Sequence, residues 1–349
     1  MTSTITTMTS SQALLCSSSS FYFHGTKPVL CSNPSLCHSP KQVHQRRFVL
    51  AAMDAKTSSS TNSIITSKRD LKLKKLACCA VPEKSTSSNE ELDGNFRRVL
   101  QFLLWVAEGV YILWLFLLPY APGDPVWAIS SETVNSLVGL SLNFFFILPL
   151  MNSVGIRLID APVLHPMSEG LFNFVIGWTL MFAPLLFTDR RRDRYKGSLE
   201  VLWGFQMFLT NTFLIPYMAI RLNEAEPNET PSKRSRLGDV MTNGAAIVGL
   251  TGGLVCLISA LWALFGRMDG NFGSISDRWE FLVGYLGSER LAYAFIWDIC
   301  LYLVFQPWLI GDNLQNVQKD KVSIVNYLRF VPVAGLVAYL LYLNIDDEL

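Results

Sequence analysis

The chain has 349 residues, of which 50% are hydrophobic and 16% are charged, and its formal net charge is +1. Soluble domains carry about 25% charged residues, so this composition favours an integral membrane protein. The net charge argues against a basic surface for nucleic acid, and the seven cysteines form neither a CxxC motif nor a zinc-binding Cys/His spacing.

Residues 1–80 have the composition of an organelle-targeting leader. Ser and Thr dominate residues 1–69, basic residues are scattered through them, and Asp54 is the only acid before Asp70. A Ser-rich, acid-poor and mildly basic segment is typical of a transit peptide, whereas a secretory signal needs a longer apolar stretch than this segment contains. A disordered cytosolic tail and a mitochondrial transit peptide are the alternatives.

The leader resembles the transit peptides of plant chloroplast proteins, and Val49-Leu50-Ala51-Ala52 is similar to their loose stromal processing pattern. With the apolar remainder of the chain, it makes the protein resemble the plastid-targeted polytopic membrane proteins of plants, a group without an assigned activity. The resemblance implies a chloroplast membrane, thylakoid or inner envelope, and no particular chemistry. We expect a short polar linker over residues 81–96 to follow the leader.

The next segment, residues 97–345, predicts an all-α bundle of transmembrane helices with six to seven spans. A helix needs about twenty mostly apolar residues to cross a hydrocarbon core of about 30 Å. Seven stretches reach or approach this length and are apolar around most of their circumference: residues 99–119, 133–152, 169–188, 199–220, 242–265, 290–310 and 325–344. We expect residues 346–349 to form an acidic, solvated tail.

Some of these stretches carry further signals. The second and seventh are the weakest, because they are shorter or are interrupted by Asn and Pro. On the fifth, Ala245, Gly249 and Gly253 recur at four-residue spacing, which predicts a face where a neighbouring helix packs closely. Residues 278–287 are predicted to form a short interfacial or re-entrant helix.

The basic residues of the loops predict no orientation. If all seven stretches cross the bilayer, nine Lys and Arg residues lie on one side and eight on the other. The excess of positive charge that orients most membrane proteins is therefore missing. The densest cluster, residues 189–194, is expected to face the stroma.

Two carboxylates inside the expected spans are the main candidates for function. Glu108 and Asp298 each lie in the first half of a span, where an ionised carboxylate is costly unless it is paired or wetted. No Lys or Arg lies within the apolar parts of these spans to neutralise them. We expect them to be proton- or ion-coupling groups, with Gln206, Asn211 and Asn143 as neutral neighbours; the alternative is that they reach water at the interface.

A second group of polar residues lies between the second and third spans. His165 is the only histidine outside the leader, and Asp160 and Glu169 flank it. These side chains are the secondary candidates, because they are close enough in sequence to form a small acid/base group. A lone histidine beside two acids is more often a surface hydrogen-bonding site, and we predict no metal site here.

Similar proline-containing phrases recur along the chain. Pro184 and Pro307 each end a Phe-X-Pro phrase, and each is followed five residues later by an aspartate, Asp189 and Asp312. An internal duplication, which many transporters contain, would explain this recurrence. Because proline also commonly stops or kinks a helix near its end, chance similarity is the alternative.

Three functions fit these features, in decreasing order of support. The first is a solute or ion carrier in which Glu108 and Asp298 face a central cavity. The second is a non-catalytic accessory or assembly protein of a photosynthetic membrane complex, and the third is a membrane-embedded lipid or isoprenoid enzyme. No motif for phosphate binding, hydrolysis or haem ligation occurs, so no catalytic residue or cofactor is indicated. The expected partners are the lipid bilayer and, for the second function, the membrane complex.

Overall fold

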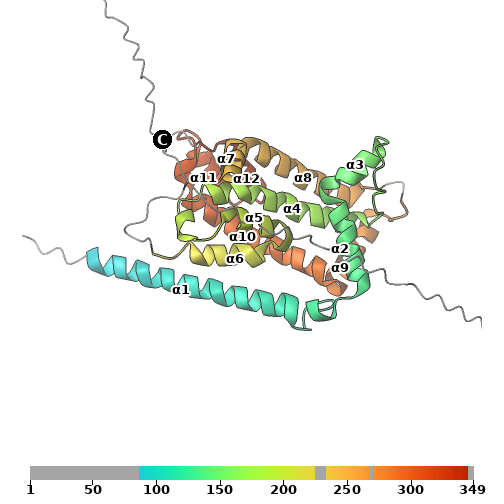
Figure 1. Ribbon diagram of the computed structural model, residues 1–349, viewed down its shortest axis with the longest axis horizontal. Helices are drawn as coiled ribbons and strands as arrows, with labels where there is room; N and C mark the ends of the chain where they lie inside the picture. The colour runs from blue at the N-terminus through green and yellow to red at the C-terminus, as the bar shows by residue number, and fades with distance from the viewer. Residues whose placement is uncertain (1–85, 225–232, 268–269, 345–349) are drawn as a thin grey trace, which may run out of the picture. The chain divides into compact units, whose positions relative to one another are not determined.

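The computed structural model describes residues 86–224, 233–267 and 270–344, with side chains from Gly94 onward. This part of the chain is helical, with short 3-10 and π turns and an isolated bridge between Val317 and Leu343. The α-helices (Figure 1) are α1 (Thr86–Ile112), α2 (Ser131–Leu142), α3 (Ile147–Ser153), α4 (Pro166–Phe187), α5 (Leu199–Leu209), α6 (Asn211–Ile220), α7 (Arg236–Asn243), α8 (Ala245–Phe265), α9 (Ile275–Ser288), α10 (Arg290–Asp312), α11 (Val322–Leu328) and α12 (Ala334–Leu341).

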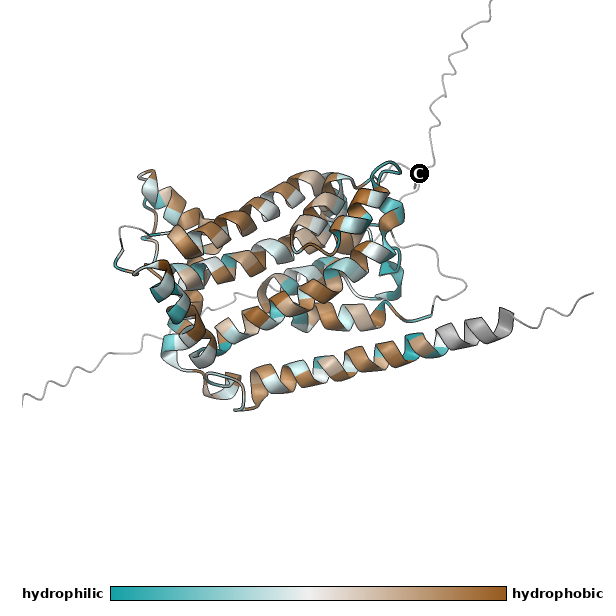
Figure 2. Cartoon of the chain, turned by 180° about the vertical axis from the view of Figure 1, so that it is seen from behind, coloured by the Kyte–Doolittle hydropathy of each residue, from teal (hydrophilic) through white to brown (hydrophobic). Residues whose placement is uncertain are grey.

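The expected all-α fold is confirmed, and the protein is a multi-pass membrane protein. Five stretches of the described chain are long and apolar enough to cross a bilayer: Gly94–Leu117, Ser131–Ser153, Pro166–Phe187, Ala245–Phe265 and Arg290–Asp312. Apolar residues cover much of their surface (Figure 2), as contact with lipid requires. The expected leader and acidic tail lie outside the described residues, and α1 begins inside the expected linker.

Helix α4 forms the centre of the bundle. Its most apolar window is 83% buried, whereas the corresponding windows of the other four stretches are 22–39% buried. Helix α8 packs against it in the antiparallel direction, since Gly170 lies against Ala263 and Gly177 lies against Gly252. A Cβ at Gly170 would come within 2.8 Å of the Ala263 Cβ, so glycine is what permits this close approach.

The small residues of α8 face a different neighbour. Gly249 lies against Leu340 and Gly253 lies against Val337, both in α12, and Ala245 is buried. The face predicted for close helix packing is therefore occupied within the chain itself.

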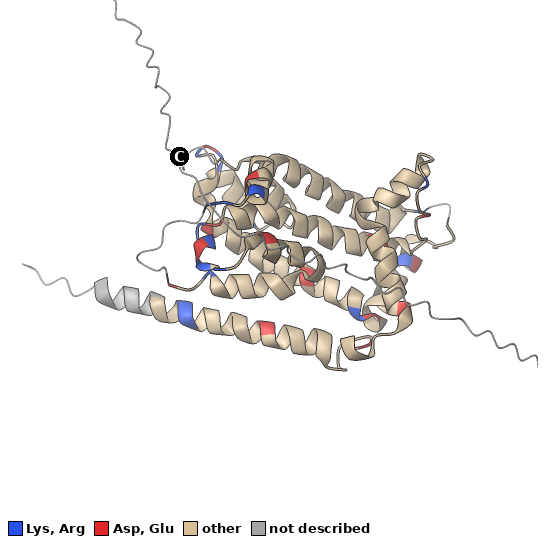
Figure 3. Ribbon diagram, in the orientation of Figure 1, with Lys and Arg blue, Asp and Glu red and all other residues tan. Residues whose placement is uncertain are grey.

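The long helices have two chemically distinct ends, where most of the charged residues gather (Figure 3). At one, which we call the charge-rich end, α4, α6 and α10 terminate together and Arg221 pairs with Asp189 and Asp312. The opposite end contains the starts of α4 and α10 and the end of α8, and includes the ion pair of Glu169 with Arg267. Helices α4 and α10 therefore run in the same direction.

The stretch Ser131–Ser153 lies at the opposite end. Thr133 donates to Glu289 beside the start of α10, and Asn143 donates to Glu169 near the start of α4. The stretch is interrupted near Phe145, which has a φ of 51° and separates α2 from α3. Figure 1 shows α2 running across the ends of the long helices.

The expected fourth span, residues 199–220, is a helical hairpin instead of one continuous helix. Thr210 separates α5 from α6 with a φ of 40° and a ψ of −109°, a conformation that L-residues rarely adopt. The hairpin returns to the end where it began, because the Tyr195 and Tyr217 rings lie 6.0 Å apart and Arg194 donates to the Arg221 carbonyl over 2.8 Å. The segment enters and leaves at the charge-rich end.

The expected seventh span, residues 325–344, has the same form. Val333 separates α11 from α12 with a φ of 61°. The bridge between Val317 and Leu343 joins the segment before α11 to the segment after α12. The C-terminal helices therefore make a second re-entrant hairpin from the charge-rich end, which explains why fewer long helices are found than the six to seven spans expected.

The two hairpins belong to a structural repeat. Thr179 of α4 and Tyr302 of α10 are 123 residues apart in sequence, and their hydroxyl oxygens lie 2.6 Å apart. The same shift relates α4 to α10, α5 to α11 and α6 to α12, and it relates the break at Thr210 to the break at Val333. The recurring Phe-X-Pro phrases and their aspartates also occupy equivalent positions.

Equivalent residues of the repeat meet between α4 and α10. Phe172 and Phe295 are equivalent residues, and their rings lie 5.8 Å apart where α4 and α10 pack in parallel. Helix α1 runs from the charge-rich end, where Arg97 pairs with Glu224, to the opposite end, where Arg290 binds the carbonyls of the turn after it. Helix α8 runs in the same direction as α1. The segments α1–α6 and α8–α12 therefore form two halves whose corresponding helices are parallel, as in transporters with parallel repeats.

Candidate functional site

The tip of the α5–α6 hairpin lies against Asp298 of α10. Asn211, the first residue of α6, donates its amide to Asp298 Oδ1 over 2.8 Å, and the Tyr111 hydroxyl of α1 donates to the same oxygen over 3.0 Å. Asp298 is 2% exposed. About 21 Å of helix separates Asp298 from Asp312 at the charge-rich end, so the tip lies deep in the span.

Several buried polar atoms at this tip have no hydrogen-bond partner among the described residues. They include the Gln206 Oε1, the Asn211 Oδ1 and the Thr212 Oγ1, and the first two side chains are fully buried. The Gln206 amide group also lies within interaction range of the Tyr302 hydroxyl. The Thr210 side chain also interacts with Asp298. A buried polar group without a partner costs about 1–3 kcal/mol, so a cluster of them indicates a place that receives a ligand or water.

Glu108 of α1 lies beside the same tip. Gln101 donates to the Ala219 carbonyl of α6 over 3.1 Å, and the two helices run antiparallel. Because both rise equally per residue, this register places Glu108 level with Thr212. Glu108 is 6% exposed, and its Oε2 has no hydrogen-bond partner in the described part of the chain.

Asn143, which we grouped with these residues from the sequence, lies at the opposite end. Its amide donates to the Pro162 carbonyl and to Glu169 Oε1. Glu169 is fully buried and also accepts hydrogen bonds from Trp262 and Arg267, each over 2.7 Å. Asn143 therefore helps to hold a buried ion pair between α4 and the segment after α8.

The three secondary candidates do not converge. Asp160 is exposed, whereas Glu169 is committed to its ion pair. His165 accepts a backbone hydrogen bond in the first turn of α4 and stacks on Phe281, with ring centroids 3.5 Å apart. Burial and, to a lesser degree, the positive charge of Arg278 lower the pKa of His165 to about 4, although Glu169 opposes this shift. His165 is therefore neutral at pH 7 and acts as a helix cap.

The charge-rich end contains a buried cluster that we did not predict. Arg221 donates to both oxygens of Asp189 over 2.8 and 2.9 Å and to Asp312 over 2.9 Å. Tyr217 and Asn313 also donate to Asp189. Burial acts to raise the pKa of Asp189, but the hydrogen bonds and charge of Arg221 outweigh it and hold the pKa below its ordinary value. The cluster ties together the ends of α4, α6 and α10.

A sequence signal for this cluster was present. Arg221 follows Pro216 by five residues, the same interval that separates Asp189 and Asp312 from their prolines. In each case the proline lies in the last turns of a helix, and the charged residue lies at or just beyond its end. The same interval therefore marks both acids and the arginine that pairs with them.

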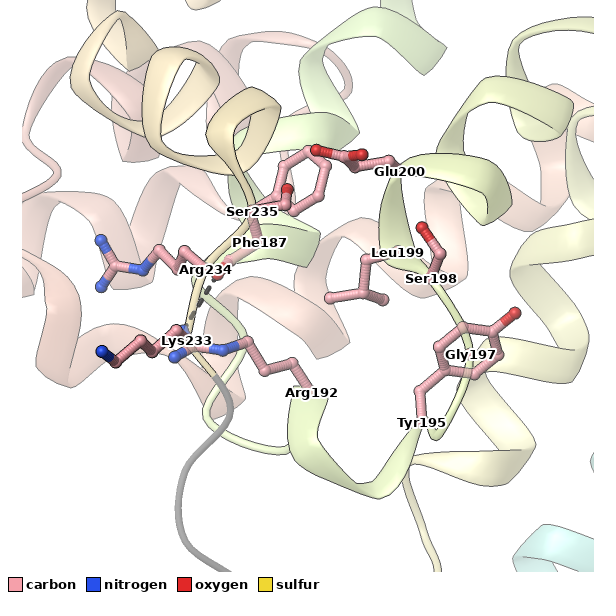
Figure 4. Close-up of a pocket in the computed structure, with 10 residues that line it drawn as sticks. All are labelled: Phe187, Arg192, Tyr195, Gly197, Ser198, Leu199, Glu200, Lys233, Arg234 and Ser235. Atoms are coloured by element: carbon pink, nitrogen blue, oxygen red, sulfur yellow. Dashed lines mark hydrogen bonds between the residues drawn. The ribbon is translucent and has the colours of Figure 1, made fainter. Parts of the chain in front are cut away.

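A polar pocket of about 240 Å³ opens beside this cluster (Figure 4). The caps of α5 and α7, Ser198 and Ser235, contribute to its wall. Arg192 reaches across it to the Phe187 carbonyl, and Glu200 accepts a hydrogen bond from the backbone in the first turn of α7. The groups lining this pocket thus connect the α5–α6 hairpin to the start of α7.

An apolar pocket of about 350 Å³ adjoins the hairpin tip. It lies between α1, α6 and α10, and Tyr111, whose hydroxyl binds Asp298, forms part of its wall. A second apolar pocket, of about 710 Å³, lies between α8, α11 and α12. Trp297 and Ile215 of the first pocket are equivalent in the repeat to Phe174 and Ala338 of the second, so each half of the protein has one.

Within the described residues, no group of three or more His, Cys, Asp or Glu side chains is arranged to hold a metal ion. No protein-family model, curated protein or solved structure matches the chain.

Proposed function

We propose that the protein is a carrier for a solute or ion and that the tip of the α5–α6 hairpin is its binding site. The observation that carries this proposal is the placement of the tip against the buried Asp298, beside polar atoms that have no hydrogen-bond partner in the described part of the chain. Helices interrupted inside a membrane expose backbone and polar groups that bind solutes near the bilayer midplane. Such interruptions occur only where they are buried in protein or line a cavity.

The repeat supports the same proposal. Many transporters consist of two like halves that move relative to each other around a site at their interface. Here Thr179 and Tyr302 mark the contact between the halves, and Tyr302 lies in α10, one turn beyond Asp298. The two re-entrant hairpins are the elements that such a movement would displace.

The composition of residues 1–80 supports a chloroplast membrane, thylakoid or inner envelope, as the place of action. The leader is Ser-rich and acid-poor, as transit peptides are. A green fluorescent protein fusion to residues 1–80 should enter chloroplasts, and a cytosolic or mitochondrial signal would contradict this part of the proposal.

An accessory or assembly protein of a photosynthetic membrane complex is the second candidate. It is favoured by the hydrogen bonds to Asp298 from Tyr111 and Asn211, which join three helices and would suit a purely structural carboxylate. Glu108 and Gln206 fit this function less well, because both are buried and the Glu108 Oε2 and the Gln206 Oε1 have no hydrogen-bond partner among the described residues. A lipid or isoprenoid enzyme has the least support, since the secondary candidates do not converge.

Flux measurements in liposomes test the carrier. Wild-type protein should transport at least one member of a panel of ions and small polar solutes. Asp298→Asn should reduce that flux about tenfold or more, because a hydrogen bond to a charged group contributes about 1.5–3 kcal/mol. Glu108→Gln should also reduce the flux, because it removes the carboxylate that lies level with the tip.

Asp312→Asn is the matched control, because it makes the same change on the same helix in the charge-rich cluster, away from the hairpin tip. It should retain flux once the amount of folded protein is equalised. Absence of flux by the wild type across the panel, or full flux by Asp298→Asn, would count against the carrier and favour the accessory function.

A further inference from the structure

We propose that the hairpin tip binds a monovalent metal cation, held by the Asp298 carboxylate and the side-chain oxygens of Gln206 and Asn211. The inference rests on the proposed function, because it names the ligand class of the same site. It concerns binding, however, and can be tested without transport.

The available donors at the tip are oxygen atoms. Gln206 Oε1 and Asn211 Oδ1 are fully buried and lack hydrogen-bond partners among the described residues, and Asp298 supplies a carboxylate. The interactions of Asp298 come from Tyr111, Thr210 and Asn211, none of which is cationic. Carboxylate and amide oxygens are the ligands of hard cations.

The helix ends at the tip favour a cation near the C-terminal end of α5. The start of α6 is already matched by a negative group, because Asn211 at its first position binds Asp298. Helix α5 ends at the tip with its last carbonyl groups directed along the helix axis, which is the negative end of its dipole. A cation between Gln206 and Asp298 would be attracted by both.

The number of charges favours a monovalent ion over a divalent one. Calcium takes 6–8 oxygen ligands, often several of them carboxylates, and magnesium usually keeps several waters and contacts carboxylates or phosphates. The tip presents one carboxylate in contact with Asn211, and Glu108 lies on the neighbouring helix without a hydrogen bond to the group. One carboxylate and one monovalent cation leave the buried site neutral, which lowers its desolvation penalty.

The second hairpin shows what a closed tip looks like. There the Gln306 amide donates to the carbonyls of Arg329 and Val331, each over 2.9 Å, and its oxygen accepts from Trp178 over 2.9 Å. The residue equivalent to Gln306 in the first half is Ala183. The first hairpin therefore has no amide from α4 to cap its tip carbonyls.

The ligand side chains are also confined to the first hairpin. The residues equivalent to Asp298, Gln206 and Asn211 are Val175, Arg329 and Ala334. The repeat therefore combines one hairpin sealed by an internal amide with one whose oxygen atoms are left available. We infer that a cation completes the first tip as Gln306 completes the second.

Thermal unfolding of the full-length protein in detergent tests this inference. NaCl or KCl should raise the Tm in a saturable manner at constant ionic strength, and choline chloride should not. Asp298→Asn should abolish the saturable shift. Gln206→Leu should raise the half-saturating concentration about tenfold or more, since one charge-assisted ligand is lost, and Asp312→Asn should leave it unchanged.

Several results would overturn the cation site. They are an equal shift with choline, a saturable shift that persists in Asp298→Asn, or a response to MgCl₂ or CaCl₂ alone. If Asp298→Asn does not fold, the binding of ²²Na⁺ or ⁸⁶Rb⁺ is measured for Gln206→Leu and Asn211→Leu, and each should bind the cation more weakly than the wild type. Cation binding without flux in liposomes would contradict the carrier and support the cation site. Flux that does not depend on the cation would contradict the cation site and support the carrier.

Discussion

Arg221 is a fully buried guanidinium shared by two acids that are equivalent in the repeat. It binds Asp189 through two parallel hydrogen bonds and Asp312 through a third. Tyr217 and Asn313 donate further hydrogen bonds to Asp189. Bidentate geometry with further hydrogen bonds is the arrangement in which a buried ion pair offsets its desolvation. One side chain thus holds three helix ends in place.

Arg221→Met should lower the free energy of unfolding by about 3–5 kcal/mol, because it leaves Asp189 buried without its counter-charge. The double variant Asp189→Asn, Arg221→Met should recover part of this loss, since the uncompensated charge is removed. Denaturant unfolding in detergent measures both effects. A loss of about 1 kcal/mol or less, typical of exposed ion pairs, would contradict the burial of the cluster.

The pH dependence of this loss has a defined sign. In the wild type the pKa of Asp189 is depressed, because the hydrogen bonds and charge of Arg221 outweigh the opposing effect of burial. The resulting stabilisation is present above an unfolded-state pKa of about 4 and is lost as the pH falls through the folded-state value. Without Arg221, the hydrogen bonds from Tyr217 and Asn313 remain, but the largest effects that oppose burial are lost. The pKa of Asp189 therefore rises, and protonation stabilises the variant. The difference between the two proteins should shrink from pH 8 to pH 5; a constant gap would contradict this.

At the scale of elements, the hairpin tips depend on strained backbone. Thr210 and Val333 have φ values of 40° and 61°, and a non-glycine residue in such a conformation costs about 1–3 kcal/mol. The strain is tolerated because packing and polar contacts fix both tips, through Asn211 in the first hairpin and Gln306 in the second.

Thr210→Gly should therefore be more stable than Thr210→Ala by about 1 kcal/mol or more. Both variants lose the hydroxyl that interacts with Asp298, but glycine alone adopts the required φ without a Cβ clash. The difference in stability between the two variants therefore measures the free-energy cost of the backbone strain at position 210. Equal Tm values for the two proteins would show that the tip is not strained.

The sequence predicted the positions of the apolar segments better than their path through the bilayer. The expected stretches 99–119, 169–188, 242–265 and 290–310 each overlap a long helix. Residues 199–220 and 325–344 have the length and hydropathy of spans but form hairpins, because the breaks occur at Thr210 and Val333. Neither residue is a glycine, and the strain at each is maintained by tertiary contacts that no local pattern reveals.

The candidate site was partly predictable for a related reason. Glu108, Asp298, Gln206 and Asn211 stand out because polar groups are expensive in an apolar stretch, and the structure brings all four to one hairpin tip. Asn143 stands out on the same ground, yet it packs with Glu169 at the other end. The path of the hairpin determines which polar residues come into contact, and the hydropathy of the sequence does not reveal that path.

At the scale of the whole molecule, the hairpins redistribute the basic residues between the two ends. With re-entrant segments and α2 across the opposite end, thirteen Lys and Arg residues lie at the charge-rich end and four at the other. Those at the charge-rich end are Arg97, Arg98, Arg190, Arg191, Arg192, Arg194, Lys196, Arg221, Lys233, Arg234, Arg236, Lys319 and Lys321, and the four are Arg157, Arg267, Arg278 and Arg290. The near-even division expected from seven crossing spans came from counting residues 133–152 and the α5–α6 hairpin as spans, whereas no Lys or Arg follows the second hairpin.

Positive charge near the ends of membrane helices is retained on the side from which a protein is inserted. We therefore expect the charge-rich end to face the stroma if the protein resides in a chloroplast membrane. Single cysteines at Lys196 and Glu224, which flank the α5–α6 hairpin, should then react with an impermeant maleimide from the same side of sealed vesicles. A cysteine at Glu132, near the opposite end, should react only from the other side, with native cysteines replaced by serine throughout.

This labelling pattern separates the two topologies directly. A crossing helix over residues 199–220 would make Lys196→Cys and Glu224→Cys react from opposite sides, whereas the hairpin makes them react together. In a reversed orientation with the hairpin intact, each cysteine would react from the other side. Lys196→Cys and Glu224→Cys would still react together, and Glu132→Cys would still react from the side opposite to them. Since both hairpins enter from the charge-rich end, the labelled side also identifies the compartment that this end and both hairpin bases face.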